Sequence, residues 1–176
     1  VILPPTYPLI IGMLLGLVFR GVAFEFRWRD ERHRPFWDVA FFGGSLVAAL
    51  SQGMVLGAIL QGIAVTGRSY SGSWWDWLTP YTLLTGLGVV AGYALLGACW
   101  LVWKLEGEVQ AKAFRLATRA ALATLALMAA VSLYNLTLLP AYRVRWLGAP
   151  EIYFASQVPL LTVIIAGFLF YGLRKR

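Results

Sequence analysis

Charged side chains interrupt an apolar stretch near the start of the chain, and the acid among them is a candidate for proton transfer. Arg20 and Glu25 stand five positions apart in the segment 19–27 (FRGVAFEFR), or about 7.5 Å apart along a helix axis. Apolar neighbours favour the neutral form of the Glu25 carboxyl and nearby arginines favour its charged form, so this group could take up and release protons. The simpler alternative is a structural ion pair at a helix end, with Arg27 extending to the lipid headgroups.

Four further charges at the expected membrane boundary, Arg27, Asp38, Lys104 and Glu106, are interpreted as structural. Asp38 stands at the expected start of a helix, where a carboxylate caps backbone N–H groups and is favoured by the helix dipole. Lys104 and Glu106 belong to a charged segment that is most simply a solvated turn.

The other reactive side chains do not form a recognisable site. His33 is the only histidine and lies among arginines, whose charge disfavours a metal cation. Cys99 is the only cysteine, so no disulfide or zinc site can be drawn within the chain. No catalytic triad, phosphate-binding loop or dinucleotide fingerprint is present. We therefore expect no catalytic, metal-binding or cofactor-binding residue in these 176 residues.

The elements that must position these charges are membrane helices. Hydrophobic residues make up 60% of the chain and charged residues 13%, and the mean hydropathy is +0.71, which excludes a soluble globular domain. About 20 apolar residues span a bilayer as a helix. The sequence predicts an all-α, polytopic bundle forming one transmembrane domain over 1–176. Its five helices are expected at about 7–26, 38–67, 77–104, 115–139 and 150–173.

Basic residues predict the orientation of this bundle. Of the 15 Lys and Arg residues, twelve fall in the connections 20–38 and 104–119 and in the tail 174–176, and three fall in the other connections. Basic residues accumulate on the cytoplasmic side, so we expect the N-terminus outside, the C-terminus in the cytoplasm, and a multi-pass plasma membrane protein. The net charge of +7 is then a topology signal, and no nucleic-acid partner is expected.

Small and cyclic residues predict how the helices pack. Gly12 and Gly16 are four residues apart, as are the pairs Gly53/Gly57 and Gly88/Gly92. This spacing allows close helix approach, either within the chain or against another subunit. Pro159 predicts a kink in the last helix. The apolar start, without a Met or a signal peptide, predicts a piece of a longer polytopic chain.

Six short stretches, in this order, resemble subunit II of the cytochrome bd-type quinol oxidases. They are FRGVAFEFR (19–27) followed by FWD (36–38), LQG (60–62), WLTPYTLLTG (77–86), GACWL (97–101) and KLEGE (104–108). The similarity covers nearly the whole chain.

The resemblance implies a nine-helix subunit paired with a homologous subunit I, of which these five helices would be the third to seventh. Subunit I of that family holds two b-type haems and one d-type haem, and the two subunits together oxidise quinol and reduce dioxygen to water with cytoplasmic protons. The present chain would then bind no haem and would meet quinol only through its partner; some family members hold a structural quinone. Arg20 and Glu25 match the arginine and acid that the family places near a cytoplasmic proton route.

Two other functions remain open at this point. One is a component of a membrane transporter or permease, and the other is a purely structural membrane scaffold. Transporters commonly carry polar binding groups or broken helices near the bilayer midplane, and only Pro159 approaches such a feature.

Overall fold

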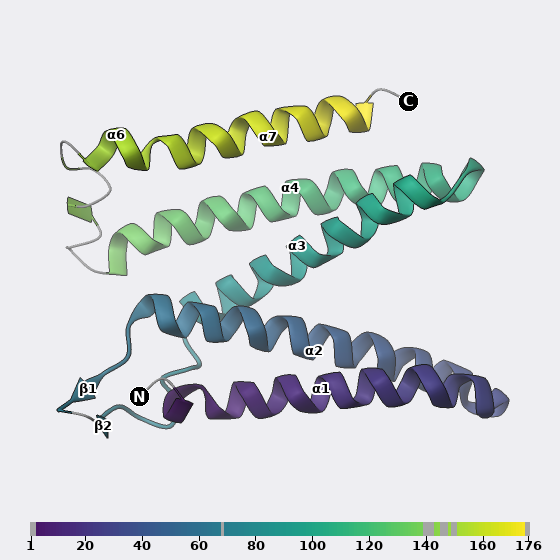
Figure 1. Ribbon diagram of the computed structural model, residues 1–176, viewed down its shortest axis with the longest axis horizontal. Helices are drawn as coiled ribbons and strands as arrows, with labels where there is room; N and C mark the ends of the chain where they lie inside the picture. The colour runs from purple at the N-terminus through teal and green to yellow at the C-terminus, as the bar shows by residue number, and fades with distance from the viewer. Residues whose placement is uncertain (1–2, 68, 139–142, 145–147, 149–150, 175–176) are drawn as a thin grey trace. The chain divides into compact units, whose positions relative to one another are not determined.

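The computed structural model describes residues 3–67, 69–138, 143–144, 148 and 151–174 of the chain (Figure 1). The elements are α1 (Leu3–Arg29), η1 (Glu31–His33), α2 (Arg34–Gln61), β1 (Val65–Thr66), β2 (Ser69–Tyr70), α3 (Pro80–Lys104), α4 (Gly107–Leu138), α6 (Glu151–Ala155) and α7 (Gln157–Arg174). They fall into two compact units, Val1–Tyr93 and Ala94–Arg176, and α3 contributes to both. Each unit is described by itself.

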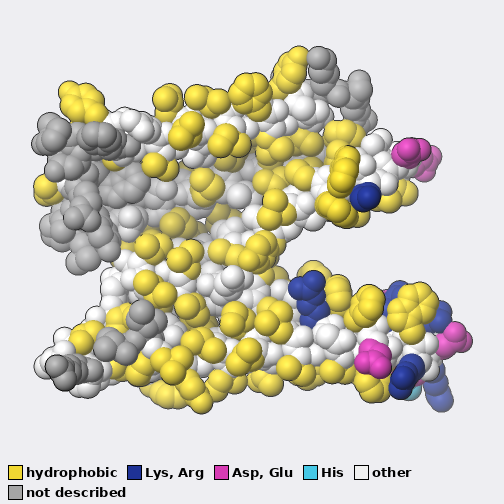
Figure 2. All heavy atoms as spheres, viewed as in Figure 1, with side chains coloured by type: hydrophobic (Ala, Val, Ile, Leu, Met, Phe, Trp, Pro, Cys, Tyr) yellow, Lys and Arg dark blue, Asp and Glu magenta, His cyan; other side chains and the backbone are white. Residues whose placement is uncertain are grey.

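Four of the helices are long and apolar enough to cross a membrane, namely α1, α3, α4 and the run formed by η1 and α2. In each, at most 28% of the most apolar window is buried, so its apolar side chains mainly face outward, and Figure 2 shows them as yellow surface along the helices. The expected all-helical membrane architecture is confirmed, with a fifth helix that is shorter than expected. The only strands in the described residues are the antiparallel pair β1 and β2.

Glycine contacts join α1 to α2. A Cβ placed on Gly16 would lie 2.7 Å from the carbonyl oxygen of Gly44, and one on Gly44 would lie 2.5 Å from that of Gly16. These distances leave no room for a side chain, so the two backbones cross at this point in direct contact. The predicted close approach at Gly16 is therefore an approach within the chain.

A second close approach joins α2 to the first half of α3. A Cβ on Gly53 would lie 2.7 Å from the Cα of Gly86, and the hydroxyl of Tyr93 donates a hydrogen bond to Oε1 of Gln52 at 2.9 Å. At Gly92, by contrast, a Cβ would meet nothing within 4 Å. The glycine spacing thus predicts the packing at Gly53 but not at Gly92.

Helix α1 starts and ends three to four residues beyond its expected bounds, α2 starts four residues earlier than expected, and α3 starts three residues later. Two larger differences need a physical reason. The second helix ends at Gln61 instead of 67, because Gly62 adopts φ = +94°, which ends the helix and leads to the β1–β2 hairpin. The fourth helix begins at Gly107 instead of 115, since Gly107 at φ = +69° reverses the chain directly after α3. The charged segment after α3 is therefore mostly helical.

The last expected helix is divided at Ser156 into α6 and α7. Pro159 lies three residues beyond the division, has no N–H to donate, and would clash with the carbonyl of Ala155 in a continuous helix. The predicted kink is confirmed, and it explains why α7, at 18 residues, is the short apolar helix. Within this unit α7 packs beside α4 (Figure 1).

Candidate functional site

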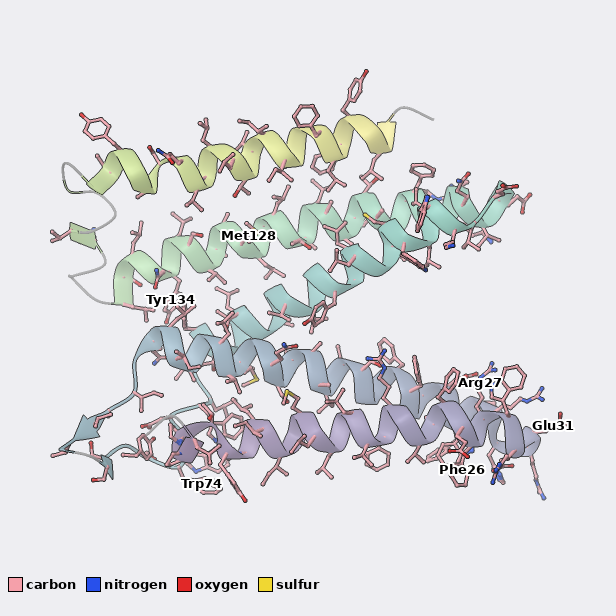
Figure 3. All side chains as sticks on the ribbon, in the orientation of Figure 1. Phe26, Arg27, Glu31, Trp74, Met128 and Tyr134 are labelled. Atoms are coloured by element: carbon pink, nitrogen blue, oxygen red, sulfur yellow. The ribbon has the colours of Figure 1, made fainter. Side chains whose placement is uncertain are left out.

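Most charged side chains of α1, η1 and α2 gather where α1 ends and α2 begins, at one end of the helix pair (Figure 2). Helix α1 runs to Arg29, and the short η1 turns the chain into α2 at Arg34. The stretch is too rich in charged groups to enter hydrocarbon, so the turn lies where the apolar faces of both helices end. Arg27 and Glu31 mark this end in Figure 3.

An ion pair between Arg27 and Asp38 links the two helices at this end. Nε of Arg27 donates to Oδ1 of Asp38 at 2.5 Å, and both side chains are about half exposed. Beside it, the rings of Phe26 and Trp37 lie 5.2 Å apart. The expectation that Asp38 caps a helix is wrong, because α2 begins four residues earlier, at Arg34. Its carboxylate instead joins α1 to α2.

Arg20 and Glu25 make different contacts. The guanidinium of Arg20 lies 5.5 Å from the ring centre of Phe41 on α2, a cation–π distance. Oε1 of Glu25 lies 3.7 Å from a terminal nitrogen of Arg29. Among the described side chains no ion pair joins Arg20 to Glu25, and both are exposed. The carboxyl of Glu25 is thus open to its surroundings, with one loose partner.

The remaining charges of this end form local pairs that sequence reasoning missed. Asp30 accepts a hydrogen bond from the backbone N–H of His33 and contacts Nδ1 of the same residue at 2.8 Å. Partial desolvation raises the pKa of Asp30, but hydrogen bonds with His33 and Trp37 and the charge interaction with His33 together hold the pKa below its usual value. Arg34 donates to Glu31 at 2.7 Å. An aspartate before a three-residue turn, as in DERH, is the signal that could have identified this cap.

In the second unit, Lys104 is the last residue of α3, and Glu106 lies in the link between α3 and α4. Nζ of Lys104 lies 5.4 Å and 4.8 Å from the ring centres of Trp100 and Trp103, so the ammonium contacts aromatic faces instead of a carboxylate. Glu106 is exposed in the link between the helices. The structure therefore brings Arg27 and Asp38 together, and it joins neither Lys104 to Glu106 nor Arg20 to Glu25.

A polar junction at the other end of the first unit was also missed. Oγ1 of Thr79 donates to Oε1 of Gln61 at 2.7 Å, while Thr79 and Thr82 exchange hydrogen bonds between backbone N–H and side-chain oxygen. This reciprocal cap begins α3 and ties it to the last residue of α2. Two of the stretches quoted above, LQG and WLTPYTLLTG, meet here, which gives their polar residues a structural role.

The chain matches one family model along its whole length. Residues 1–176 match the model described as cytochrome bd terminal oxidase subunit II. This agrees with the resemblance carried by the motifs.

Three known relatives are named as subunit 2 of a cytochrome oxidase. The chain is 32% identical over 146 residues to cytochrome bd-I ubiquinol oxidase subunit 2 of Escherichia coli (strain K12). This alignment covers 79% of this chain and 38% of that protein. It is 30% identical to a probable cytochrome oxidase subunit 2 of Haemophilus influenzae, over 73% of this chain and 36% of the relative. It is 26% identical to cytochrome bd ubiquinol oxidase subunit 2 of Bacillus subtilis, in an alignment that covers 61% of this chain and 32% of that protein. The chain thus spans less than two fifths of the length of these relatives.

Proposed function

The chain belongs to the cytochrome bd terminal oxidase subunit II family, and from this premise we propose that it is a haem-free subunit of a quinol-oxidising, dioxygen-reducing complex. In this proposal it stabilises a haem-bearing subunit I and contributes a cytoplasmic proton route, in the plasma membrane of a bacterium or archaeon. The observation that carries the proposal is the family match over all 176 residues. Four helices capable of spanning a membrane support it.

The histidine content and metal-ligand content of this part of the protein support a haem site in the partner instead of in this chain. Its one histidine, His33, lies exposed on the charged connection and contacts Asp30. Among the described residues no three His, Cys, Asp or Glu side chains form a group that could hold a metal ion. Haem iron in proteins is held by axial His, Met, Cys or Tyr ligands in a largely enclosed pocket. The donor set here therefore favours haem binding by the partner.

The contacts of Arg20 and Glu25 support a proton route along α1. Glu25 is exposed, so its carboxyl can exchange protons with water near the end of the helix. Arg20 lies about 7.5 Å farther into the apolar part of α1, and its stacking on Phe41 fixes its charge there. A positive charge held there repels an excess proton, so Arg20 itself is not assigned to the relay. We infer that Glu25 relays protons and that Arg20 is a positioning residue.

The test is replacement of these residues in the full-length, assembled oxidase. Because Glu25→Gln removes the only group that we assign to proton relay, we expect quinol-driven oxygen consumption per haem to fall by about tenfold or more. Glu25→Asp keeps a carboxylate and should restore most of the rate. Arg20→Leu should lower the rate and shift its pH profile, whereas a purely structural arginine would affect only the yield of assembled complex.

Asp38→Asn is the matched control, because it removes a carboxylate from the same end of the unit. It breaks an exposed ion pair worth about 0.2–1 kcal/mol, so stability should fall slightly while the rate per haem stays unchanged. An unchanged rate in Glu25→Gln with normal haem content would refute the proton route and favour a scaffold. A colourless native preparation without any haem protein would refute the oxidase assignment and favour a transporter component.

A further inference from the structure

Helix α4 is longer than a membrane span requires. Its 32 residues extend about 48 Å, while the hydrocarbon core of a bilayer is about 30 Å thick. The uncharged part, 120–138, is long enough by itself, at about 28 Å. The first turns of α4, residues 107–119, therefore project beyond the hydrocarbon as helix.

This projecting segment has one basic face. Lys112, Arg115 and Arg119 are exposed, and their spacings of three and four residues place them on one side of the helix. Ala113 and Ala117, on the other side, are 5% and 0% exposed. The basic face is thus turned away from the packed face. We call Lys112, Arg115 and Arg119 the basic ridge.

The order of charges along α4 matches the layers of a membrane surface. Glu108, in the first turn, is farthest from the apolar part. Arg119 directly precedes the apolar part, with Arg115 about 6 Å and Lys112 about 10 Å farther out. Acidic groups thus lie outermost, in water, and basic groups lie nearest the hydrocarbon.

The end of α3 gives evidence for the position of the membrane boundary that does not depend on the charges of α4. Nε2 of Gln110 donates to the carbonyl oxygen of Val102 at 3.0 Å, which places the end of α3 beside the first turns of α4. Trp100 and Trp103 lie there with 56% and 71% exposure, and Lys104 stacks on both rings. Exposed tryptophans of this kind belong to the membrane–water interface.

The two helices together bracket the boundary. Helix α4 is apolar only from residue 120 onward, whereas α3 remains apolar up to Trp103, near the level of Gln110. The headgroup layer must lie between these two levels, and the basic ridge occupies the same interval. The abundant anion in that layer is lipid phosphate, which arginine binds through paired N–H groups.

We propose that the basic ridge is a binding surface for anionic phospholipid headgroups, with Trp100 and Trp103 marking its interfacial edge. The surface is formed by the chain's own fold and does not depend on the proton route.

Photo-crosslinking of the full-length complex in phosphatidylcholine nanodiscs tests this surface directly. The probes are phosphatidylglycerol and phosphatidylcholine that carry the same photoreactive group near the headgroup, and the labelled peptides are quantified by mass spectrometry. One cation near an anionic headgroup is worth about 1 kcal/mol, or roughly a fivefold preference. We expect the ratio of phosphatidylglycerol to phosphatidylcholine labelling on 107–119 to exceed the ratio on α7 by at least that factor. Raising the salt concentration should lower the ratio in the unmodified protein.

The triple variant Lys112→Gln/Arg115→Gln/Arg119→Gln should bring the labelling ratio on this segment close to that on α7. The matched control, Arg29→Gln/Arg32→Gln/Arg34→Gln, removes the same charge from the end of the first unit and should leave the ratio unchanged. Equal ratios on the two segments of the unmodified protein would overturn the proposal, as would an equal effect of both triple variants. Displacement of the lipid by millimolar inorganic phosphate would show a site for a free anion and would also overturn it.

Discussion

Asp76 organises the connection between β2 and α3 through a small set of short hydrogen bonds. Its Oδ2 accepts from the hydroxyl of Tyr70 at 2.7 Å and from the backbone N–H of Ser73 at 2.9 Å. The same tyrosine hydroxyl lies 2.6 Å from the carbonyl oxygen of Ser73. Burial and the adjacent carboxylate raise the pKa of Tyr70 from 10.0 to about 12, because both disfavour the phenolate. A single carboxylate thus holds a loop that has little regular structure.

This arrangement predicts the alkaline behaviour of the loop. The pKa of Tyr70 is higher in the folded chain, so its contribution to stability is fully present below about pH 10 and is lost as the pH approaches about 12. Asp76→Asn removes the negative charge and should lower the pKa of Tyr70. The measurement is a pH titration of tyrosinate absorbance. Subtracting the curve of the matching Tyr70→Phe variant isolates Tyr70 from the seven other tyrosines. A Tyr70 that titrates near pH 10 in both the unmodified protein and Asp76→Asn would contradict the hydrogen-bonded arrangement.

At the scale of elements, packing depends on a few glycines and one proline. Gly16 and Gly44 let α1 and α2 meet backbone to backbone, and Gly53 does the same for α2 and α3. Helices in lipid gain little from hydrophobic association, so close van der Waals contact supplies much of their affinity. Pro159 acts within a single helix, because it divides what would otherwise be one continuous helix into α6 and α7.

Adjacent glycines of α2 provide a controlled test of this contact. A Cβ at Gly44 would meet the Gly16 carbonyl oxygen at 2.5 Å, whereas a Cβ at Gly43 would meet nothing within 4 Å. We expect Gly44→Ala to destabilise the protein by about 1–3 kcal/mol, since backbone cannot move aside easily. Gly43→Ala should be neutral or stabilising by up to about 1 kcal/mol, because alanine is the better helix former. Thermal unfolding midpoints of the full-length protein measure both, and equal midpoints would refute the contact.

At the scale of the whole molecule, apolar helix surfaces are flanked by unequally charged connections. The described structure agrees with a multi-pass membrane protein, and the family match agrees with a respiratory oxidase subunit. The orientation still rests on the basic residues, twelve of which are assigned to one side. The proposed direction of proton uptake depends on this orientation.

Thiol labelling in intact cells measures the orientation. In a Cys99→Ser background, Ser71→Cys places a thiol in the β2–α3 connection and Arg32→Cys places one between α1 and α2. Because the connection that contains Arg32 is rich in basic residues, we expect a membrane-impermeant maleimide to label it only after permeabilisation. Residue 71 should be labelled in intact cells. The reverse pattern would contradict both the orientation and cytoplasmic proton uptake through Glu25.

Three properties could be predicted from the amino-acid sequence: that this is a helical membrane protein, where most of its helices lie, and to which family it belongs. These properties follow from hydropathy and motifs along the chain, and for that reason they could be predicted without coordinates. The sequence also indicated Arg20, Glu25, Arg27 and Asp38 as the charges to consider.

Only the tertiary structure decided which of these charges meet. Arg27 pairs with Asp38 because the Gly16–Gly44 contact sets the register between α1 and α2, and Arg20 contacts Phe41 for the same reason. The early start of α4, and with it the alignment of the basic ridge, depends on a positive φ angle at Gly107. Spacing along a sequence does not specify helix register, since register is set by contacts between segments distant in the chain, and it does not specify the φ angle at one glycine.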